Sequence, residues 1–289
     1  MLIMHYVTAN SILSSKNGMN IYRGCSHGCI YCDSRSEIYN MHHKFEDIEV
    51  KLNACDLLKK ELIKRPKAMI ATGAMSDPYC AVEKHLKYTR KALELIDRYG
   101  FGFTCITKSD LILRDLDLLK RINEKSKVVV QMTLTTADDE VCKIVEPNVC
   151  KTSKRVKALK KLNSAGIPTV VWLCPILPYI NDSEENINKI LDLCIDVGVR
   201  GIICFGMGLT LRKGNRQYFY KKLDEHFPNL KEKYIEKFKS NYHIPSPNNK
   251  QLMEIFNNKT SKYGIMNDFN EIFNYLAYFP RDSIQSKLI

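Results

Sequence analysis

Short apolar segments rich in β-branched residues alternate with longer amphipathic segments over the first two thirds of the chain. The short segments predict buried β-strands, and the longer ones, with apolar residues three and four positions apart, predict helices. The predicted strands are residues 19–23, 68–72, 102–107, 128–134, 169–173 and 201–205. The predicted helices are residues 51–63, 83–99, 113–123, 152–163 and 184–197. In the first helix, the predicted apolar face consists of Leu52, Leu57, Leu58, Leu62 and Ile63.

The repeated strand-then-helix order predicts an α/β fold with a parallel sheet and right-handed crossovers. We expect a partial six-stranded (β/α) barrel. Gly100, Gly166 and Gly198 stand where three of the helices end, and glycine favours the left-handed residue that ends a helix. Ser183 precedes Glu184, where a serine caps the start of a helix.

The strand pattern stops after Gly208, and residues 212–289 are rich in Lys, Tyr, Phe and Asn. We therefore expect a barrel domain over residues 1–208 and a helical C-terminal appendage over residues 209–289. A chain of 289 residues accommodates both, since α/β barrels reach ~250 residues as one domain. The appendage carries aromatic residues at helical spacing, which favours a packed core over base stacking. They are Tyr218, Phe219, Tyr220, Phe227, Tyr234 and Phe238.

The composition, with 45% hydrophobic and 26% charged residues, is that of a folded globular protein. There are 44 Lys and Arg against 32 Asp and Glu, which gives a formal charge of +12. Such a surface attracts polyanions, so a nucleic acid or nucleotide is a candidate partner, although a general lysine bias explains the charge equally well. Residues 151–161 hold six Lys or Arg and no acid, and predict a solvated helix face.

The longest apolar run, residues 167–180, contains three prolines and is shorter than the ~20 residues of a membrane span. The first ten residues lack the basic and apolar regions of a secretory signal. We therefore expect a cytoplasmic protein without a membrane segment. Eleven cysteines, an odd number, favour reduced thiols and a metal site over a disulfide framework.

Cys25, Cys29 and Cys32 form a C-x3-C-x2-C motif directly after the first predicted strand. Three thiolates on one short loop can hold three irons of a 4Fe–4S cluster and leave the fourth iron without a protein ligand. A zinc site that uses His27 or Asp33 is an alternative, although the paired spacing of zinc knuckles is missing. An electron-transfer cluster that takes a remote fourth cysteine is another.

The motif and its position resemble the radical S-adenosylmethionine superfamily, in the branch of spore photoproduct lyase-like proteins. The resemblance implies a partial (β/α) barrel, one 4Fe–4S cluster on the three cysteines, and S-adenosylmethionine bound to the open iron. It also implies an external electron donor of the flavodoxin or ferredoxin type, and reductive cleavage to a 5′-deoxyadenosyl radical. The further segments that carry it are residues 72–79, 86–94, 107–109, 114–115, 135–136, 146–147 and 165–168.

The resemblance and the strand ends together suggest contacts to S-adenosylmethionine. Lys108 ends a strand where its ammonium can pair with the cofactor carboxylate, unless it is merely solvated. Thr133 and Thr135 share a strand face, and their hydroxyls either contact the cofactor or serve strand packing. The predicted cofactor-binding residues are Tyr31, Thr72, Gly73, Ser76, Lys108, Thr133, Thr135 and Pro175.

Two positions depart from the lyase pattern. Ala74 replaces the cysteine that returns a hydrogen atom in the lyase, and Asp33 replaces the tyrosine that relays the radical. We therefore expect a radical enzyme that does not reverse spore photoproduct by the lyase route, and a nucleic acid or nucleotide is the favoured substrate over a peptide or small metabolite. Tyr79 and Cys80 are weak candidates for a displaced relay, although Cys80 is expected to lie on an exposed loop without a role.

Overall fold

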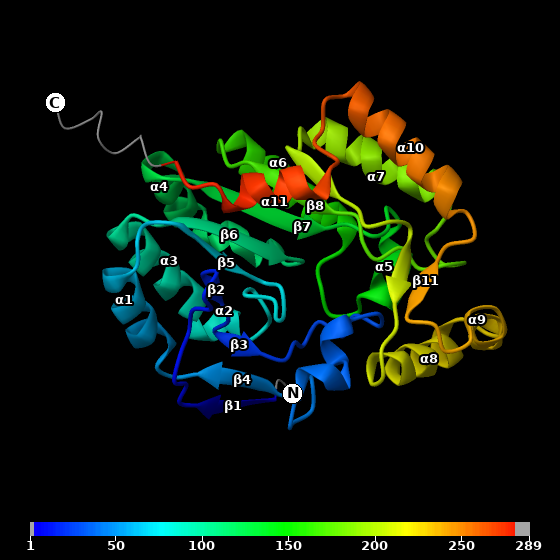
Figure 1. Ribbon diagram of the computed structural model, residues 1–289, viewed down its shortest axis with the longest axis horizontal. Helices are drawn as coiled ribbons and strands as arrows, with labels where there is room; N and C mark the ends of the chain where they lie inside the picture. The colour runs from blue at the N-terminus through cyan, green and yellow to red at the C-terminus, as the bar shows by residue number, and fades with distance from the viewer. Residues whose placement is uncertain (1–2, 281–289) are drawn as a thin grey trace.

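The computed structural model describes residues 3–280 and confirms the predicted α/β fold. Six strands form one parallel sheet in the order β2-β5-β6-β7-β8-β9. The parallel register brings the carboxyl ends of the strands to one edge, where the cysteine loop also lies (Figure 1). The strands are β2 (Gly18–Met19), β5 (Met69–Thr72), β6 (Gly102–Thr107), β7 (Val128–Thr133), β8 (Thr169–Trp172) and β9 (Gly201–Ile203).

Helices cover the sheet much as the sequence predicts. The helices that precede residue 208 are α1 (Ala54–Lys64), α2 (Glu83–Leu86), α3 (Tyr88–Tyr99), α4 (Leu116–Lys125), α5 (Asp139–Val145), α6 (Thr152–Ser164) and α7 (Glu184–Val197). Gly100, Gly166 and Gly198 have positive φ at helix ends, and the Ser183 hydroxyl accepts from the Asn186 amide at the start of α7. These predicted helix boundaries are confirmed.

Three helix predictions are wrong in detail. The single helix predicted over residues 83–99 is two helices, because Lys87 has a left-handed backbone (φ 56°) between α2 and α3. Residues 110–115 form a 3₁₀ helix, so α4 begins at Leu116. In α1, the buried face contains Ala54, Leu58 and Leu62, whereas Leu52 and Ile63 are more than half exposed.

A second, three-stranded sheet was not predicted. It contains β1 (Met4–Val7), β3 (Tyr22–Arg23) and β4 (Ile48–Lys51) in the order β1-β4-β3. The strand predicted over residues 19–23 is therefore wrong, since its first part pairs with β5 as β2 and its last part pairs with β4 as β3. The chain changes sheet just before the cysteine loop.

The chain beyond residue 208 contains strands as well as helices, which corrects the all-helical expectation. β10 (Gly208–Thr210) pairs antiparallel with β11 (His243–Pro245), and between them lie α8 (Asn215–His226) and α9 (Leu230–Phe238). Phe219, Tyr234 and Phe238 are buried there, as their spacing predicts. α10 (Asn249–Lys262) then packs against α7, and α11 (Phe269–Ala277) packs against β9 (Figure 1). The division at residue 208 stays a prediction.

The eleven cysteines all lie within the described residues and none forms a disulfide. Among residues 3–280, no helix has the length and apolar character that a bilayer span requires. The cytoplasmic location stays a prediction.

Candidate active site

The loop that carries the three cysteines leaves the three-stranded sheet directly after β3. Cys25 and Cys29 are buried, and Cys32 is half-buried. Gly24 has φ 85°, and a Cβ on it would lie 2.7 Å from the Phe45 carbonyl oxygen. The Cys25 amide donates to the same oxygen at 2.9 Å. Only glycine fits at this position, because the loop lies directly against the chain that leads into β4.

The three thiols fit a cluster better than a single ion. No three of the cysteines, His27 and Asp33 have ligand atoms that all lie within 4.8 Å of one another, whereas thiolates on one tetrahedral zinc ion stand about 3.8 Å apart. Burial raises the pKa of Cys29 to about 12, so this thiol keeps its proton until a metal replaces it. Thiols that are spread in this way, two of them buried, suit an iron–sulfur cluster.

Asp77 joins the cysteine loop to the end of β6. Its carboxylate lies 2.9 Å from His27 Nε2 and accepts from the Thr107 hydroxyl at 2.7 Å and the Lys108 amide at 2.8 Å. Burial alone would raise the pKa of Asp77, but His27 and these hydrogen bonds lower it to about 2. Asp77 is therefore ionised at neutral pH and fixes the loop relative to the sheet.

Glu146 and Arg155 form a second buried pair behind the same loop. Both side chains are fully buried and form a salt bridge. Glu146 also accepts from the Tyr31 hydroxyl, and Arg155 donates to the Thr133 carbonyl at 2.8 Å and the Cys150 carbonyl at 2.9 Å. Burial would raise the pKa of Glu146, but the Arg155 charge holds it below its usual value. The prediction of a solvated face over residues 151–161 is thus wrong at Arg155.

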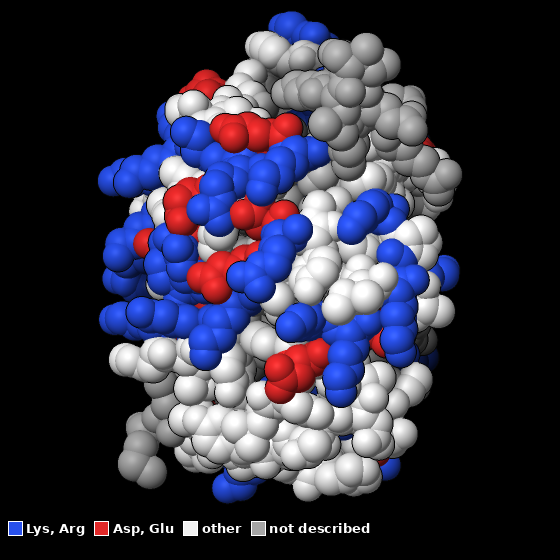
Figure 2. All heavy atoms as spheres, turned by 90° about the vertical axis from the view of Figure 1, so that its left-hand side faces the viewer, with Lys and Arg blue, Asp and Glu red and all other residues white. Residues whose placement is uncertain are grey.

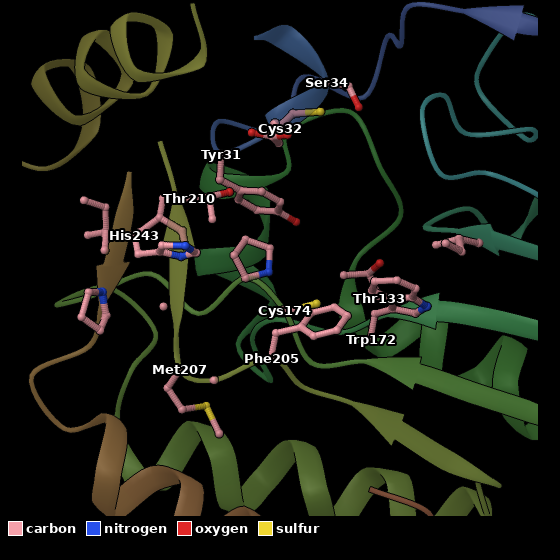
Figure 3. A pocket seen from close by; sticks show the side chains of 18 of the residues that line it. Tyr31, Cys32, Ser34, Thr133, Trp172, Cys174, Phe205, Met207, Thr210 and His243 are labelled. Carbon is pink, nitrogen blue, oxygen red and sulfur yellow. The ribbon is translucent and has the colours of Figure 1, made fainter. Parts of the chain in front are cut away.

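A cavity of about 730 Å³ opens at the carboxyl edge of the sheet, beside the cysteine loop. Five of the eight predicted cofactor-binding residues line it, namely Tyr31, Gly73, Lys108, Thr133 and Pro175, as does Cys32. Figure 3 shows Tyr31 and Cys32 on one side and Trp172, Phe205 and Thr133 across from them. Among the described residues, Lys108 is the only Lys or Arg that lines the cavity.

The other predicted site residues lie behind the cavity wall. Ser76 donates from its hydroxyl to the Gly24 carbonyl, so it contacts the cysteine loop. Thr72 pairs with Cys105 inside the sheet. The Thr135 hydroxyl is buried without a partner. The backbone carbonyl of Thr135 accepts hydrogen bonds from the side-chain amides of Asn181 and Asn186.

Tyr79 and Cys80 do not line the cavity either. Their side chains are 1% and 0% exposed and belong to the hydrophobic core. The expectation that Cys80 lies on an exposed loop is therefore wrong. Their relay role stays a prediction, and the structure places neither side chain on the cavity.

Sequence reasoning missed most of the opposite wall. Trp172 stands at the end of β8, where a strand-end rule could have found it. Phe205 follows β9, while Thr210 and His243 come from β10 and β11, which the sequence did not predict. The lining residues not assigned from the sequence include Ser34, Trp172, Cys174, Phe205, Met207, Thr210, His243 and Asn249.

Comparisons with known proteins agree with this geometry. The family model described as the Radical SAM superfamily matches residues 19–194. An uncharacterized protein of Methanocaldococcus jannaschii is 34% identical over 185 residues, which is 63% of this chain and 69% of that protein. An uncharacterized protein of Mycobacterium tuberculosis is 28% identical over 258 residues, which is 86% of this chain and 75% of that protein.

Solved structures of spore photoproduct lyase share the fold. The lyase complexed with dinucleoside spore photoproduct superposes with a TM-score of 0.65 and 16% identity, over 91% of this chain and 81% of that chain. A double mutant of the lyase with bound AdoMet and dinucleoside spore photoproduct gives 0.62 and 16%, over 87% and 75%. At this identity the likeness establishes the fold only.

The family match covers the three-cysteine loop, Asp77, the Glu146–Arg155 pair and the ends of β5 to β8. The family implies a 4Fe–4S cluster and S-adenosylmethionine, and the buried, spread thiols beside a cavity suit both. On these grounds the chain belongs to the radical S-adenosylmethionine superfamily and is a radical S-adenosylmethionine enzyme.

Proposed function

We propose that this enzyme reductively cleaves S-adenosylmethionine and abstracts hydrogen from a nucleic acid or nucleotide. When bound, the cluster and S-adenosylmethionine supply one-electron cleavage to a 5′-deoxyadenosyl radical. Cys25, Cys29 and Cys32 would hold the cluster, with the electron coming from an external donor of the flavodoxin or ferredoxin type. The surrounding residues position the two groups and exclude water.

The cavity wall beside the cysteine loop suits S-adenosylmethionine. Lys108 offers an ammonium to a carboxylate. Burial alone would lower the pKa of Lys108, but the neighbouring Cys29 and Glu146 side chains raise it. A Cβ at Gly73 would collide with the Ile106 carbonyl, so only glycine fits beside the cavity there. Tyr31, Pro175 and, across the cavity, Thr133 complete the proposed set, while Thr72, Ser76 and Thr135 would support these residues from behind.

The opposite wall suits a nucleobase, and this observation carries the substrate proposal. Phe205 is 57% exposed, and its ring lies 5.9 Å from Trp172 in an edge-on arrangement. Trp172 is fixed by a 2.7 Å hydrogen bond from its Nε1 to Gln131. An exposed aromatic ring beside a cavity, such as that of Phe205, provides a stacking surface for a base. The lyase neighbour bound to a dinucleoside supports the same class of substrate.

Many exposed Lys and Arg side chains lie on a face that does not line the cavity. Figure 2 shows many Lys and Arg side chains, with Asp and Glu among them, on the left-hand side of Figure 1, where α1, α3 and α4 lie. The exposed cations of these helices are Lys59, Lys60, Lys64, Lys91, Arg98, Lys120, Arg121 and Lys125. We therefore expect base stacking, rather than a dense phosphate-binding surface, to hold the substrate at the cavity.

The chemistry at the substrate would differ from that of the lyase. Ala74 and Asp33 both line the cavity, and neither side chain has a weak bond from which to return a hydrogen atom. Tyr79 and Cys80 lie in the core. We therefore propose that the enzyme does not convert spore photoproduct into two thymines by the lyase route.

The test is stimulation of 5′-deoxyadenosine formation by added substrate. Reduced enzyme and S-adenosylmethionine are incubated with mononucleotides, short single-stranded DNA or RNA, or peptides. We expect stimulation by the nucleic acids. In Phe205→Ala the half-saturating concentration should rise ~5- to 150-fold, the range for one stacked base. Tyr263→Ala, which removes a half-exposed ring that does not line the cavity, serves as the control.

Binding across salt provides a second readout. Phosphate contacts predict a steep loss of affinity with salt, and stacking predicts a shallow one. Stimulation by peptides alone, or no nucleic-acid binding at low salt, would overturn the substrate proposal and leave the assignment to the family intact.

A further inference from the structure

We propose that His5, His43, Asp47 and Glu49 form a second metal site that binds Zn²⁺ or a similar divalent transition metal. His5 lies on β1 and Glu49 on β4, while His43 and Asp47 lie in the segment that leads into β4. None of these residues belongs to the cysteine loop or lines the cavity described above. The inference does not depend on the proposed function.

The four side chains converge in space. The ligand atoms of His5, His43 and Asp47 all lie within 4.8 Å of one another. His5 Nδ1 is 2.9 Å from Asp47 Oδ1, and His43 Nε2 is 3.7 Å from Glu49 Oε2. The parallel register of β1 and β4 places His5 directly beside Glu49. A tetrahedral ion needs ligand atoms about 3.3 Å apart, so small side-chain movements complete the site.

His43 provides the observation that points to a cation. Its Nδ1 lies 3.0 Å from the Lys44 carbonyl oxygen, so Nδ1 carries the proton in the neutral ring. Its Nε2 is then a bare acceptor, buried and without a hydrogen-bond partner, and it faces the Glu49 carboxylate. A lone pair that faces a carboxylate is repelled, so this arrangement is favourable only when a proton or a metal cation lies between the two atoms. A histidine that binds a metal through one ring nitrogen usually donates the N–H of the other to a carbonyl oxygen, a carboxylate or water, and His43 Nδ1 makes such a contact.

The ligand types favour zinc over harder cations. Two imidazoles with carboxylates are typical of Zn²⁺, whereas Mg²⁺ and Ca²⁺ prefer sites made of oxygen atoms. The four side chains are partly buried, with 16–38% of each exposed, so the ion can enter from solvent. Arg23 pairs with Glu49 in the β3–β4 register, and its guanidinium is occupied by the Tyr39 and Asn40 carbonyls.

The position of the site gives it a structural consequence. Asp47 lies in the segment against which the cysteine loop packs, since a Cβ on Gly24 would meet both the Phe45 and the Asp47 carbonyls. The Cys25 amide donates to Phe45 in the same segment. A bound ion would join β1 to this segment and so stabilise the support of the cluster loop. It would contact no reacting atom.

The experiment measures metal content and Zn²⁺ affinity in the reconstituted holoenzyme, in which the cluster already occupies the three cysteines of the loop. We expect one zinc per chain in addition to the iron of one cluster. His5→Ala and His43→Ala should weaken Zn²⁺ binding by more than about 100-fold, beyond the effect of losing a supporting contact. His42→Ala, which removes the exposed neighbour, should bind zinc as the wild type does. Iron and sulfide should stay unchanged in all three variants.

Asp47→Asn keeps the shape of the site and lowers its charge, so it tests the proposal if an alanine variant does not fold. We expect weaker Zn²⁺ binding and a smaller rise in melting temperature on zinc addition. A wild-type holoenzyme that retains no zinc at micromolar free Zn²⁺ would overturn the proposal. Equal zinc in wild type, His5→Ala and His43→Ala would also overturn it, because the ion would then be bound elsewhere.

Discussion

The two walls of the cavity are built in different ways. On the wall beside the cysteine loop, Tyr31 and Lys108 are held by buried polar groups, since Glu146 accepts from the Tyr31 hydroxyl and Asp77 accepts from the Lys108 amide. On the opposite wall, Phe205 is more than half exposed and His243 comes from a short strand with exposed ends. The first wall lies within the family match over residues 19–194, and Phe205 and His243 lie beyond it.

This difference separates two tasks. A cofactor that reacts through one geometry needs side chains whose positions are fixed by satisfied, buried hydrogen bonds. A wall that contacts only the substrate can consist of side chains that change without loss of the fold. We therefore expect changes on the first wall to affect stability and cofactor binding, and changes on the second to affect the substrate alone.

The largest effect is expected at the cluster ligands. Cys29→Ala removes one of three thiolates, so the chain should lose the cluster and form no detectable 5′-deoxyadenosine. Iron and sulfide analysis together with chromatography of the product measures both losses. Cys55→Ala, which removes a half-buried thiol from α1, is the matched control and should retain both. Normal turnover in Cys29→Ala would break the assignment of the loop.

The next effect is on stability and concerns the buried pair. Glu146→Ala leaves the Arg155 charge buried without its partner, which should lower the free energy of unfolding by about 3–5 kcal/mol. Denaturant unfolding measures this change. Glu185→Ala, which breaks an exposed pair with Lys189, should leave the stability close to that of the wild type. The double variant Glu146→Leu, Arg155→Met should recover much of the loss, and no recovery would contradict the electrostatic explanation.

Lys108→Met tests the first wall without removing its bulk. Loss of a charged hydrogen bond should weaken S-adenosylmethionine binding ~10- to 100-fold, with the iron content unchanged. Equilibrium binding of the cofactor gives the result directly. Phe205→Ala should leave that affinity within about twofold. If Phe205→Ala weakens the cofactor as much as Lys108→Met does, the separation of the two walls is wrong.

The smallest effect concerns Asp77 and how the stability of the protein changes at acidic pH. Its pKa of about 2 is below the usual 3.8, so folding favours the ionised form. This contributes ~2 kcal/mol of stability above pH 3.8, which is lost as the pH falls toward 2. Asp77→Asn should therefore be less stable at pH 6, and its difference from the wild type should narrow as the pH falls from 4 to 3. A constant difference across that range would contradict this account.

The sequence predicted the parts of the site that local patterns determine. Tyr31 belongs to the cysteine motif, and Gly73 and Lys108 follow strands whose apolar runs are clear. In a parallel sheet such strand ends meet at one edge, so their positions in the cavity follow from the fold. The strands β5 to β9 could be predicted because their apolar runs are clear in the sequence.

The remainder depends on contacts between distant segments. Arg155 looks like one of several solvated lysines and arginines, and only the fold brings it against Glu146. β1 is short and half exposed, and it is a strand because β4 pairs with it. His243 reaches the cavity only through the pairing of β10 with β11. Sequence periodicity contains none of this information.

The central claim is that the enzyme cleaves S-adenosylmethionine with a cluster held by the three-cysteine loop, beside the adjoining cavity wall. The most direct measurement is 5′-deoxyadenosine formation by enzyme that has been reconstituted anaerobically with iron and sulfide and reduced with dithionite. We predict that the wild type forms 5′-deoxyadenosine from S-adenosylmethionine and that each of Cys25→Ala, Cys29→Ala and Cys32→Ala forms none. A wild-type enzyme with a full complement of iron and sulfide that forms no 5′-deoxyadenosine would contradict the claim.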